Sequence, residues 1–123
     1  MSAPLLHICT SSQWRGAARA GQVRPESLDA EGFVHLSTVE QVQLPANRLY
    51  PGRTDLVLLC VDRAKLEAEL RWEPGVPGDP TAMRFPHLYG PLPLGAVVAV
   101  LDYRPDSSGR FYPPRGVAEL GTR

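Results

Sequence analysis

The chain has 123 residues, of which 43% are hydrophobic and 21% are charged. These values are typical of one globular domain, and they exclude a two-domain protein and an intrinsically disordered chain. The thirteen basic and thirteen acidic residues cancel. We therefore expect neither a membrane surface nor nucleic acid to be bound non-specifically.

The apolar runs at 56–61 and 95–101 are much shorter than the roughly 18 residues of a membrane span. No basic region followed by an apolar stretch opens the chain, so no secretory signal is expected. Cys9 and Cys60 lie within apolar runs, where a free thiol behaves as a small buried hydrophobe. We predict a cytoplasmic protein without disulfides.

The N-terminal segment predicts a strand followed by a helix. Apolar and β-branched residues cluster at 5–10 without a helical period, which is typical of a strand. Ser11 or Ser12 is expected to cap a helix over 13–20, and Gly21 is expected to end it.

Residues 22–31 mix proline, serine and acidic residues without a period, which predicts a loop. The next segment, 32–37, predicts a second strand. Because side chains alternate along a strand, one face carries Phe33, His35 and Ser37.

Thr38 is expected to cap a further helix, with Glu40 and Gln41 close to the position from which a side chain can reach back to the cap. Pro45 either kinks this helix or begins a second short one that ends near Tyr50. The continuous apolar run 55–61 then predicts a strand buried on both faces, at the centre of a sheet.

Asp62 is expected to cap a short helix through Leu70, before a proline- and glycine-rich loop at 74–80. Two more strands are predicted over 85–89 and 96–103.

This element order indicates an α+β fold. We predict a single domain over residues 1–104 and a poorly ordered tail over 105–123, where proline, glycine and serine accumulate. The glycine-rich signatures of dinucleotide-binding and P-loop proteins are absent from the sequence.

All three histidines lie in strand-like or apolar surroundings: His7, His35 and His87. Each is either a satisfied core residue or a functional one. An imidazole has one donor and one acceptor and titrates near neutral pH, which suits it to orienting sugar hydroxyls or to acid–base work.

Glu73 follows Trp72 and precedes a proline. It is either an exposed carboxylate at a strand end or a carboxylate beside an aromatic wall of a cleft, where the apolar neighbour would raise its pKa. Ser37 and Thr38 form a helix cap, and the amides that follow could also receive an anionic group of a ligand.

A zinc site is the competing interpretation, because His7, Cys9, His35 and His87 are nitrogen and sulfur donors. Their spacing contains no Cys-x-x-Cys or His-x-x-x-His pair, so no metal is expected. A metal-dependent hydrolase remains an alternative. A Ser-His-Asp hydrolase is less favoured because no G-x-S-x-G elbow is present.

Several motifs in this order resemble the bacterial "domain of unknown function 952" family. They are Trp14, GFVHLST at 32–38, Gln41, DLVLLCVD at 55–62, LRWEP at 70–74 and FPHLYGPL at 85–92. The fold of that family is similar to that of the ADP-ribosyltransferases and RNA 2′-phosphotransferases. The resemblance implies a split β-sheet with short flanking helices and a cleft shaped for NAD.

The resemblance also implies roles for particular residues. Glu73 matches the catalytic acidic residue, and His35 belongs to the second-strand motif and is assigned to catalysis with it. The remaining matched residues are expected to contact the nucleotide: His7, Ser37, Thr38, Trp72, His87 and Tyr89. We expect Trp72 and Glu73 to share one cleft with the histidines and Ser37.

The predicted function is therefore that of an ADP-ribosyltransferase-like enzyme that uses NAD or another small nucleotide. Two alternatives stay open: a non-catalytic module that binds a nucleotide or metabolite and reports it to a partner, and the metal-dependent hydrolase. Transfer of an RNA 2′-phosphate is least favoured, because none of the motifs contains a basic cluster.

Overall fold

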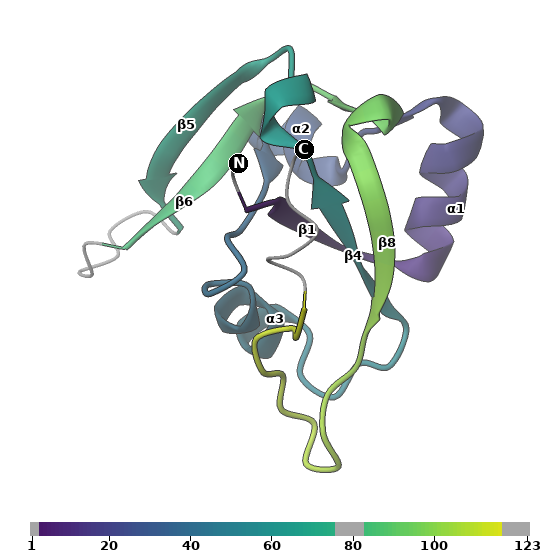
Figure 1. Cartoon of the computed structure of the whole chain (residues 1–123), viewed down its shortest axis with the longest axis vertical. Helices are drawn as coiled ribbons and strands as arrows, with labels where there is room; N and C mark the ends of the chain where they lie inside the picture. Colours follow the sequence, from purple (N-terminus) through teal and green to yellow (C-terminus); the bar gives the residue numbers. More distant parts are fainter. Residues whose placement is uncertain (1–2, 76–82, 117–123) are drawn as a thin grey trace.

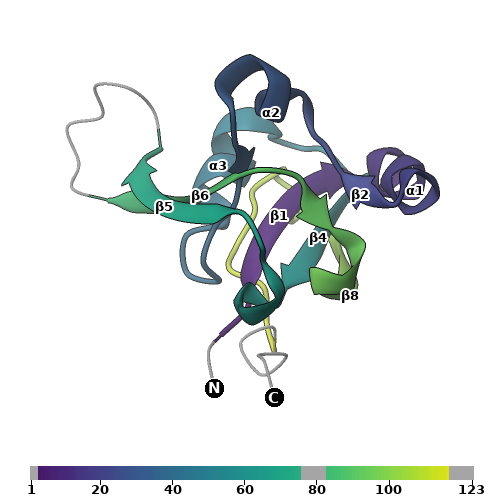
Figure 2. The same cartoon turned by 90° about the horizontal axis from the view of Figure 1, so that it is seen from above.

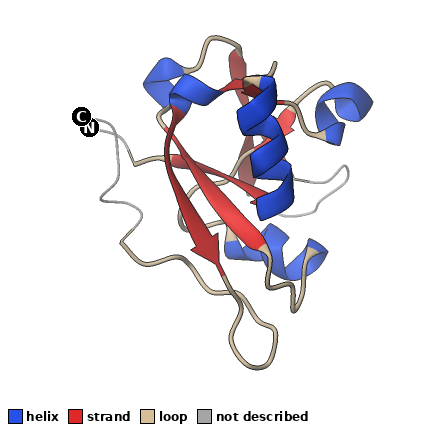
Figure 3. Cartoon of the chain, turned by 90° about the vertical axis from the view of Figure 1, so that its right-hand side faces the viewer, coloured by secondary structure: helices blue, strands red, loops and turns tan. Residues whose placement is uncertain are grey.

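The computed structural model describes residues 3–75 and 83–116. The strands are β1 (Leu5–Thr10), β2 (Gln22–Val23), β3 (Val34–His35), β4 (Leu56–Val61), β5 (Glu69–Pro74), β6 (Arg84–Tyr89), β7 (Leu92–Pro93) and β8 (Val97–Tyr103). The helices are α1 (Ser11–Ala20), α2 (Glu26–Glu31) and α3 (Gln43–Leu49), with 3-10 turns η1 (Arg63–Lys65) and η2 (Leu94–Ala96). Figure 3 shows these short helices placed around the strands. The α+β class predicted from the sequence is confirmed.

The described strands are divided among three antiparallel sheets, in the orders β1-β4-β8, β3-β6-β5 and β2-β7. The two larger sheets meet at one isolated bridge, where Leu6 and Ser37 exchange backbone hydrogen bonds of 2.7 and 2.8 Å. Figures 1 and 2 both show the β5–β6 hairpin extending away from the β1-β4-β8 sheet. The candidate site described below includes residues from both sides of the bridge.

Strand β4 is the centre of the core, as the apolar run predicts. All six of its side chains are buried, and alternate residues face two separate clusters. Helix α1 packs on one cluster through Trp14 and Ala17, and α3 packs on the other through Ala46. Each leucine or valine removed from water in this way stabilises the fold by about 1.5–3 kcal/mol.

Helix α1 begins at Ser11, two residues earlier than predicted. The Gln13 amide donates to the Thr10 hydroxyl at 3.0 Å, and the Thr10 amide donates to the Gln13 side chain at 2.8 Å. This reciprocal capping box makes Thr10 the cap, so the choice of Ser11 or Ser12 was wrong. Gly21 ends the helix at φ 90°, a left-handed conformation that glycine adopts without strain.

Thr38 and Gln41 form a second reciprocal capping box, with distances of 3.1 and 3.2 Å. The regular helix that follows starts at Gln43, and Pro45 lies in its first turn. Backbone amides in a first turn have no partner within the helix, so proline is tolerated there. Of the two alternatives for Pro45, the short helix is the one observed.

Two stretches differ from the sequence prediction. Residues 22–31, predicted as a loop, contain β2 and the six-residue α2, which is too short to display a helical period. The helix predicted to run to Leu70 is wrong. Asp62 caps only the turn η1 by accepting from the Ala64 amide at 2.9 Å, and β5 then pairs with β6 over six residue pairs. Tertiary strand pairing therefore overrides the local helix signal.

The segment after β8 packs against α3, where Figure 1 shows it in yellow. Phe111 is 1% exposed within the core, and Asn47 both donates to its carbonyl and accepts from its amide, at 2.9 and 2.7 Å. The Tyr103 hydroxyl donates to the Tyr112 carbonyl at 2.6 Å. The packed domain thus continues past residue 104, where the sequence predicts a poorly ordered tail; residues 117–123 lie outside the described part.

Cys9 and Cys60 are both free and buried, as their apolar surroundings predict. Burial raises the pKa of each thiol to about 11, because the thiolate loses hydration. Both are therefore neutral at pH 7. In the described part of the chain, no helix has the length and apolar character to cross a bilayer.

Candidate functional site

A cleft of about 570 Å³ lies between the two larger sheets and the three helices, with contributions from β1, β3, β6, α1, α2 and α3. This volume is within the range of about 300–1,000 Å³ that is usual for small-molecule sites. Its charged lining residues are Arg24, Arg48 and Glu26, and the Arg24 guanidinium also lies 3.4 Å from the Asp29 carboxylate. Its polar lining includes the three histidines and Ser37. Trp14 and Tyr50 contribute aromatic surface.

The histidines come together because two strand pairings align them. His35 lies directly opposite His87 in the register of β3 and β6, so their side chains share a face and their ring centroids are 5.2 Å apart. His7, on β1, lies one residue from the bridge that joins the sheets. All three line the cleft.

His7 is 6% exposed, and its Nδ1 lies 2.8 Å from the carbonyl oxygen of His35. Because a carbonyl only accepts, Nδ1 carries the proton and Nε2 keeps its lone pair. Burial lowers the pKa of His7 below its usual value of 6.5, against the smaller raising effect of this hydrogen bond. The side chain is therefore a neutral imidazole with an acceptor nitrogen.

The lowered pKa predicts a pH-dependent stability. Unfolded His7 binds a proton below about pH 6.5, whereas folded His7 stays neutral to a lower pH. The contribution of His7 to the free energy of unfolding is therefore complete above pH 6.5 and is lost as pH falls. From pH 6.5 to 5 the free energy of unfolding should fall by up to about 1.4 kcal/mol per pH unit from this group. Urea unfolding of wild type and His7→Gln measures it, and the variant should show a flatter profile.

Identical profiles in the two proteins would contradict this assignment. If His7→Gln does not fold, the imidazole of His7 in the wild type can be titrated by NMR, where it should remain neutral at pH values at which an exposed histidine is charged.

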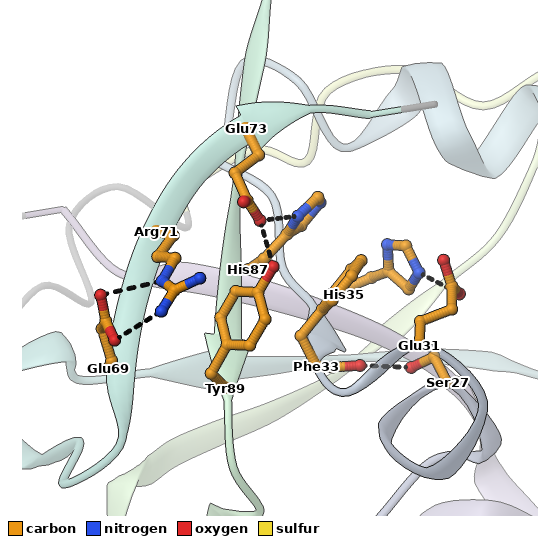
Figure 4. A network of polar contacts seen from close by, with 9 residues as sticks. All are labelled: Ser27, Glu31, Phe33, His35, Glu69, Arg71, Glu73, His87 and Tyr89. Atoms are coloured by element: carbon orange, nitrogen blue, oxygen red, sulfur yellow. Dashed lines mark hydrogen bonds and ion pairs between the residues drawn. The ribbon is translucent and has the colours of Figure 1, made fainter. Parts of the chain in front are cut away.

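His87 and Glu73 form the second polar unit of the site. The Nδ1 of His87 lies 2.9 Å from Oε1 of Glu73, and the hydroxyl of Tyr89 donates to the same oxygen at 2.7 Å (Figure 4). These two hydrogen bonds, the one from Tyr89 first, hold the pKa of Glu73 below its usual value. Of the two interpretations of Glu73, the one with an apolar neighbour predicts a raised pKa; the pKa is instead lowered, because hydrogen-bond donors surround the carboxylate.

Aromatic contacts hold the His87 ring in place. Phe33 stacks on it with centroids 4.0 Å apart and planes 15° apart, and the rings of Phe33 and His35 form a T-shaped contact with centroids 4.8 Å apart. On the other side of Glu73, the guanidinium of Arg71 lies 4.4 Å from the centroid of the Tyr89 ring. These contacts on both sides restrict the movement of the hydrogen-bonded side chains of His87, Glu73 and Tyr89.

The remaining nitrogen of His87 is unusual. The residue is 2% exposed, and Nε2 is buried without a hydrogen-bond partner among the described residues. Buried polar atoms in folded proteins nearly always have a partner. Among the described residues two other buried side-chain atoms also lack one, Gln43 Oε1 and Arg63 Nε, but of these three atoms only His87 Nε2 belongs to a residue that lines the cleft.

His35 differs from the other two histidines because 45% of its side chain is exposed. Its Nε2 lies 3.1 Å from Oε1 of Glu31, the last residue of α2 and four residues earlier in the chain (Figure 4). Its clearest structural role is through the backbone, since its carbonyl fixes the tautomer of His7.

Four predicted residues do not line the cleft: Thr38, Trp72, Glu73 and Tyr89. Glu73 is connected to the cleft by its hydrogen bond with His87, and Tyr89 by its hydrogen bond to Glu73. Trp72 neighbours Glu73 on β5, and alternation places it on the opposite face, 41% exposed and 5.8 Å from the Arg63 guanidinium. The amide and hydroxyl of Thr38 are occupied by Gln41.

Sequence reasoning did not identify Arg24, Arg48 and Tyr50 as site residues. Each lies in a polar segment or on a short helix, where its residue type is unremarkable, and only the tertiary fold brings it to the cleft. Among residues 3–75 and 83–116, no group of three histidine, cysteine, aspartate or glutamate side chains is placed to hold a metal ion.

A family model described as "Protein of unknown function (DUF952)" matches residues 8–100. The chain belongs to the DUF952 family. The match includes the three-sheet framework and most of the cleft, but it carries no described activity.

Solved structures of a Caulobacter crescentus protein, CC0527, are similar to this chain. Its crystal structure is 34% identical, with a TM-score of 0.75, and the alignment covers 88% of this chain and 92% of CC0527. Its solution NMR structure is also 34% identical, with a TM-score of 0.74 and coverage of 92% and 93%. A methionine double mutant of CC0527 gives 33% identity and a TM-score of 0.75. No curated protein matches the chain significantly.

Proposed function

We propose that the DUF952 cleft of this protein binds an anionic nucleotide, with NAD and ADP-ribose as the first candidates. The observation that carries the proposal is the meeting of two arginines, three histidines and two aromatic side chains in one cleft of about 570 Å³. In the lining of this cleft two guanidinium groups face one carboxylate, that of Glu26, whereas the chain as a whole has no net charge.

The lining matches the parts of a nucleotide. Guanidinium groups such as those of Arg24 and Arg48 bind phosphates through paired, charge-assisted hydrogen bonds. The acceptor nitrogen of His7 and the hydroxyl of Ser37 suit ribose hydroxyls. Trp14 offers apolar surface to a base.

The resemblance to ADP-ribosyltransferases favours NAD among nucleotides. It also assigns Glu73 a direct contact with the ribose, yet this carboxylate is engaged by His87 and Tyr89 and does not line the cleft. That arrangement favours two forms of the proposal: a binding module without turnover, or an enzyme in which Glu73 acts through His87. No group of described residues supports the metal-dependent hydrolase.

Calorimetry with NAD, ADP-ribose, AMP and inorganic phosphate tests the proposal. We expect NAD or ADP-ribose to bind, and at about 100 times the dissociation constant to stabilise the fold by roughly 2.7 kcal/mol in a thermal-shift experiment. Phosphate alone should bind far more weakly, because it lacks the base and ribose contacts.

A matched pair of glycine variants locates the binding. Gly16 lines the cleft, and a Cβ atom at Gly16 or at Gly95 meets no other atom within 4 Å. Gly95 lies on η2 and does not line the cleft. Gly16→Phe should therefore weaken nucleotide binding at least tenfold, whereas Gly95→Phe should leave it unchanged. Equal binding by both variants, or no nucleotide bound by wild type, would refute the proposal.

A further inference from the structure

We infer that His87 is the acid–base residue of this cleft, accepting a proton from a hydroxyl group that attacks the bound nucleotide. Glu73 and Tyr89 are positioning residues that act through it. The inference rests on the proposed function for its substrate. It goes beyond that proposal by assigning a reaction and by moving the chemistry from the carboxylate to the imidazole.

The first argument is the orientation of the ring. A carboxylate with a lowered pKa is an acceptor, so His87 donates from Nδ1 to Glu73 at 2.9 Å. In the neutral imidazole Nε2 then carries the lone pair. Stacking on Phe33 at 4.0 Å keeps the ring in this orientation.

The second argument is the unpartnered Nε2. Nδ1 is satisfied, the side chain lines the cleft, and Nε2 has no hydrogen-bond partner among the described residues. A hydroxyl of a ligand or acceptor bound in the cleft would complete it. The proton acceptor is also shielded from bulk water, which strengthens any interaction it makes with a bound group.

The third argument is the carboxylate behind the ring. When Nε2 takes a proton, the imidazolium is stabilised by the ionised Glu73 at 2.9 Å. The Tyr89 hydroxyl, donating to the same oxygen at 2.7 Å, favours the ionised carboxylate, so the proton remains on His87. Arg71, stacked on Tyr89 and paired with Glu69, further lowers the pKa of Glu73 and so keeps the carboxylate ionised.

The step balances without an oxidant or a metal. The hydroxyl oxygen of water or an alcohol forms a bond to C1′ of the nicotinamide ribose, and its proton passes to His87 Nε2. The bond from C1′ to nicotinamide breaks, and its electron pair leaves with nicotinamide as a neutral molecule. His87 then returns the proton to solvent. Free ADP-ribose as product identifies water as the nucleophile, and ADP-ribosylated alcohol identifies an acceptor.

Imidazole NMR on the ligand-free protein tests the geometry separately from binding. We expect His87 of the wild type to show a protonated Nδ1 and a bare Nε2 when neutral, and Tyr89→Phe to retain this tautomer. His87→Asn identifies the resonance by its disappearance. A wild-type His87 with the proton on Nε2 would overturn the inference, whatever the protein binds.

Nicotinamide release from NAD tests the chemistry. His87→Asn should lower kcat on the order of 100-fold or more, while the dissociation constant for NAD changes less than about threefold. Tyr89→Phe keeps the ring packing and should lower kcat by about tenfold through Glu73, leaving KM unchanged. Trp72→Phe, on the opposite face of β5, is the matched control and should not change the rate.

The outcomes separate the two proposals. The acid–base role is overturned if NAD binds but no nicotinamide is released with water or alcohol acceptors. It is also overturned if wild type and His87→Asn release nicotinamide at equal rates. Either result leaves the proposal of nucleotide binding intact. If neither NAD nor ADP-ribose binds, the proposed function fails and the reaction on NAD fails with it. Should His87→Asn not fold, the Tyr89→Phe rates and the wild-type tautomer decide.

Discussion

Replacing Phe111 by alanine is expected to lower the free energy of unfolding by about 3–5 kcal/mol. The side chain is 1% exposed and packs with Tyr103, at a centroid distance of 4.9 Å, in the cluster that includes Leu58 of β4. Truncation removes this apolar contact and leaves a cavity. Because a domain of this kind is stable by only about 5–15 kcal/mol, the loss is a large fraction of the total. Urea unfolding monitored by fluorescence and circular dichroism measures it.

Tyr112→Ala is the matched control for this experiment. Its ring is 54% exposed, and the Tyr112 carbonyl that accepts from Tyr103 belongs to the backbone. This variant should stay within about 0.5 kcal/mol of wild type. A Phe111→Ala protein as stable as the control would show that the segment after β8 is not part of the core.

The second large effect is expected at the two arginines of the cleft. If Arg24 and Arg48 bind the phosphates of NAD or ADP-ribose, each contributes a charge-assisted hydrogen bond of about 1.5–3 kcal/mol. The Arg24→Ala and Arg48→Ala double variant should therefore bind ADP-ribose on the order of 100-fold more weakly or worse. The salt dependence of binding should also become shallower, because fewer charges are paired with the ligand.

Arg15→Ala and Arg19→Ala provide the control for the arginines. Both residues are exposed on α1, and neither lines the cleft. Calorimetry at two salt concentrations should show wild-type affinity for these variants. If the double variant at Arg24 and Arg48 binds ADP-ribose as tightly as these control variants do, the phosphates are not bound by Arg24 and Arg48.

The proposed chemistry depends on indirect contacts. His7 and His87 both donate from Nδ1, to a backbone carbonyl and to a carboxylate, so both would present Nε2 as an acceptor. In each case the partner that fixes the tautomer lies on a neighbouring strand. Binding and catalysis in this cleft would therefore be sensitive to the register of β3, β5 and β6.

Several features were determined by the sequence alone, because their causes are local. The continuous apolar run at 56–61 can avoid water only by burial on both faces, and it forms the central strand β4. Alternation predicted the shared face of Phe33 and His35, and their rings are in contact. The Thr38 cap and the Gly21 stop depend on short-range hydrogen bonds and backbone conformation, so they too were predictable.

Only the tertiary structure decided the rest. Pairing with β6 turns residues 69–74 into a strand, and this places Glu73 toward His87 and Trp72 on the opposite face. Phe111 packs in the core beside Tyr103, and Asn47, 64 residues away in sequence, hydrogen-bonds its backbone. Arg24 and Arg48 reach the cleft from segments with no local signature. The physical reason is the same in each case. The hydrogen bonds and apolar contacts are made with residues far away in the sequence, and no local sequence pattern indicates which residues those are.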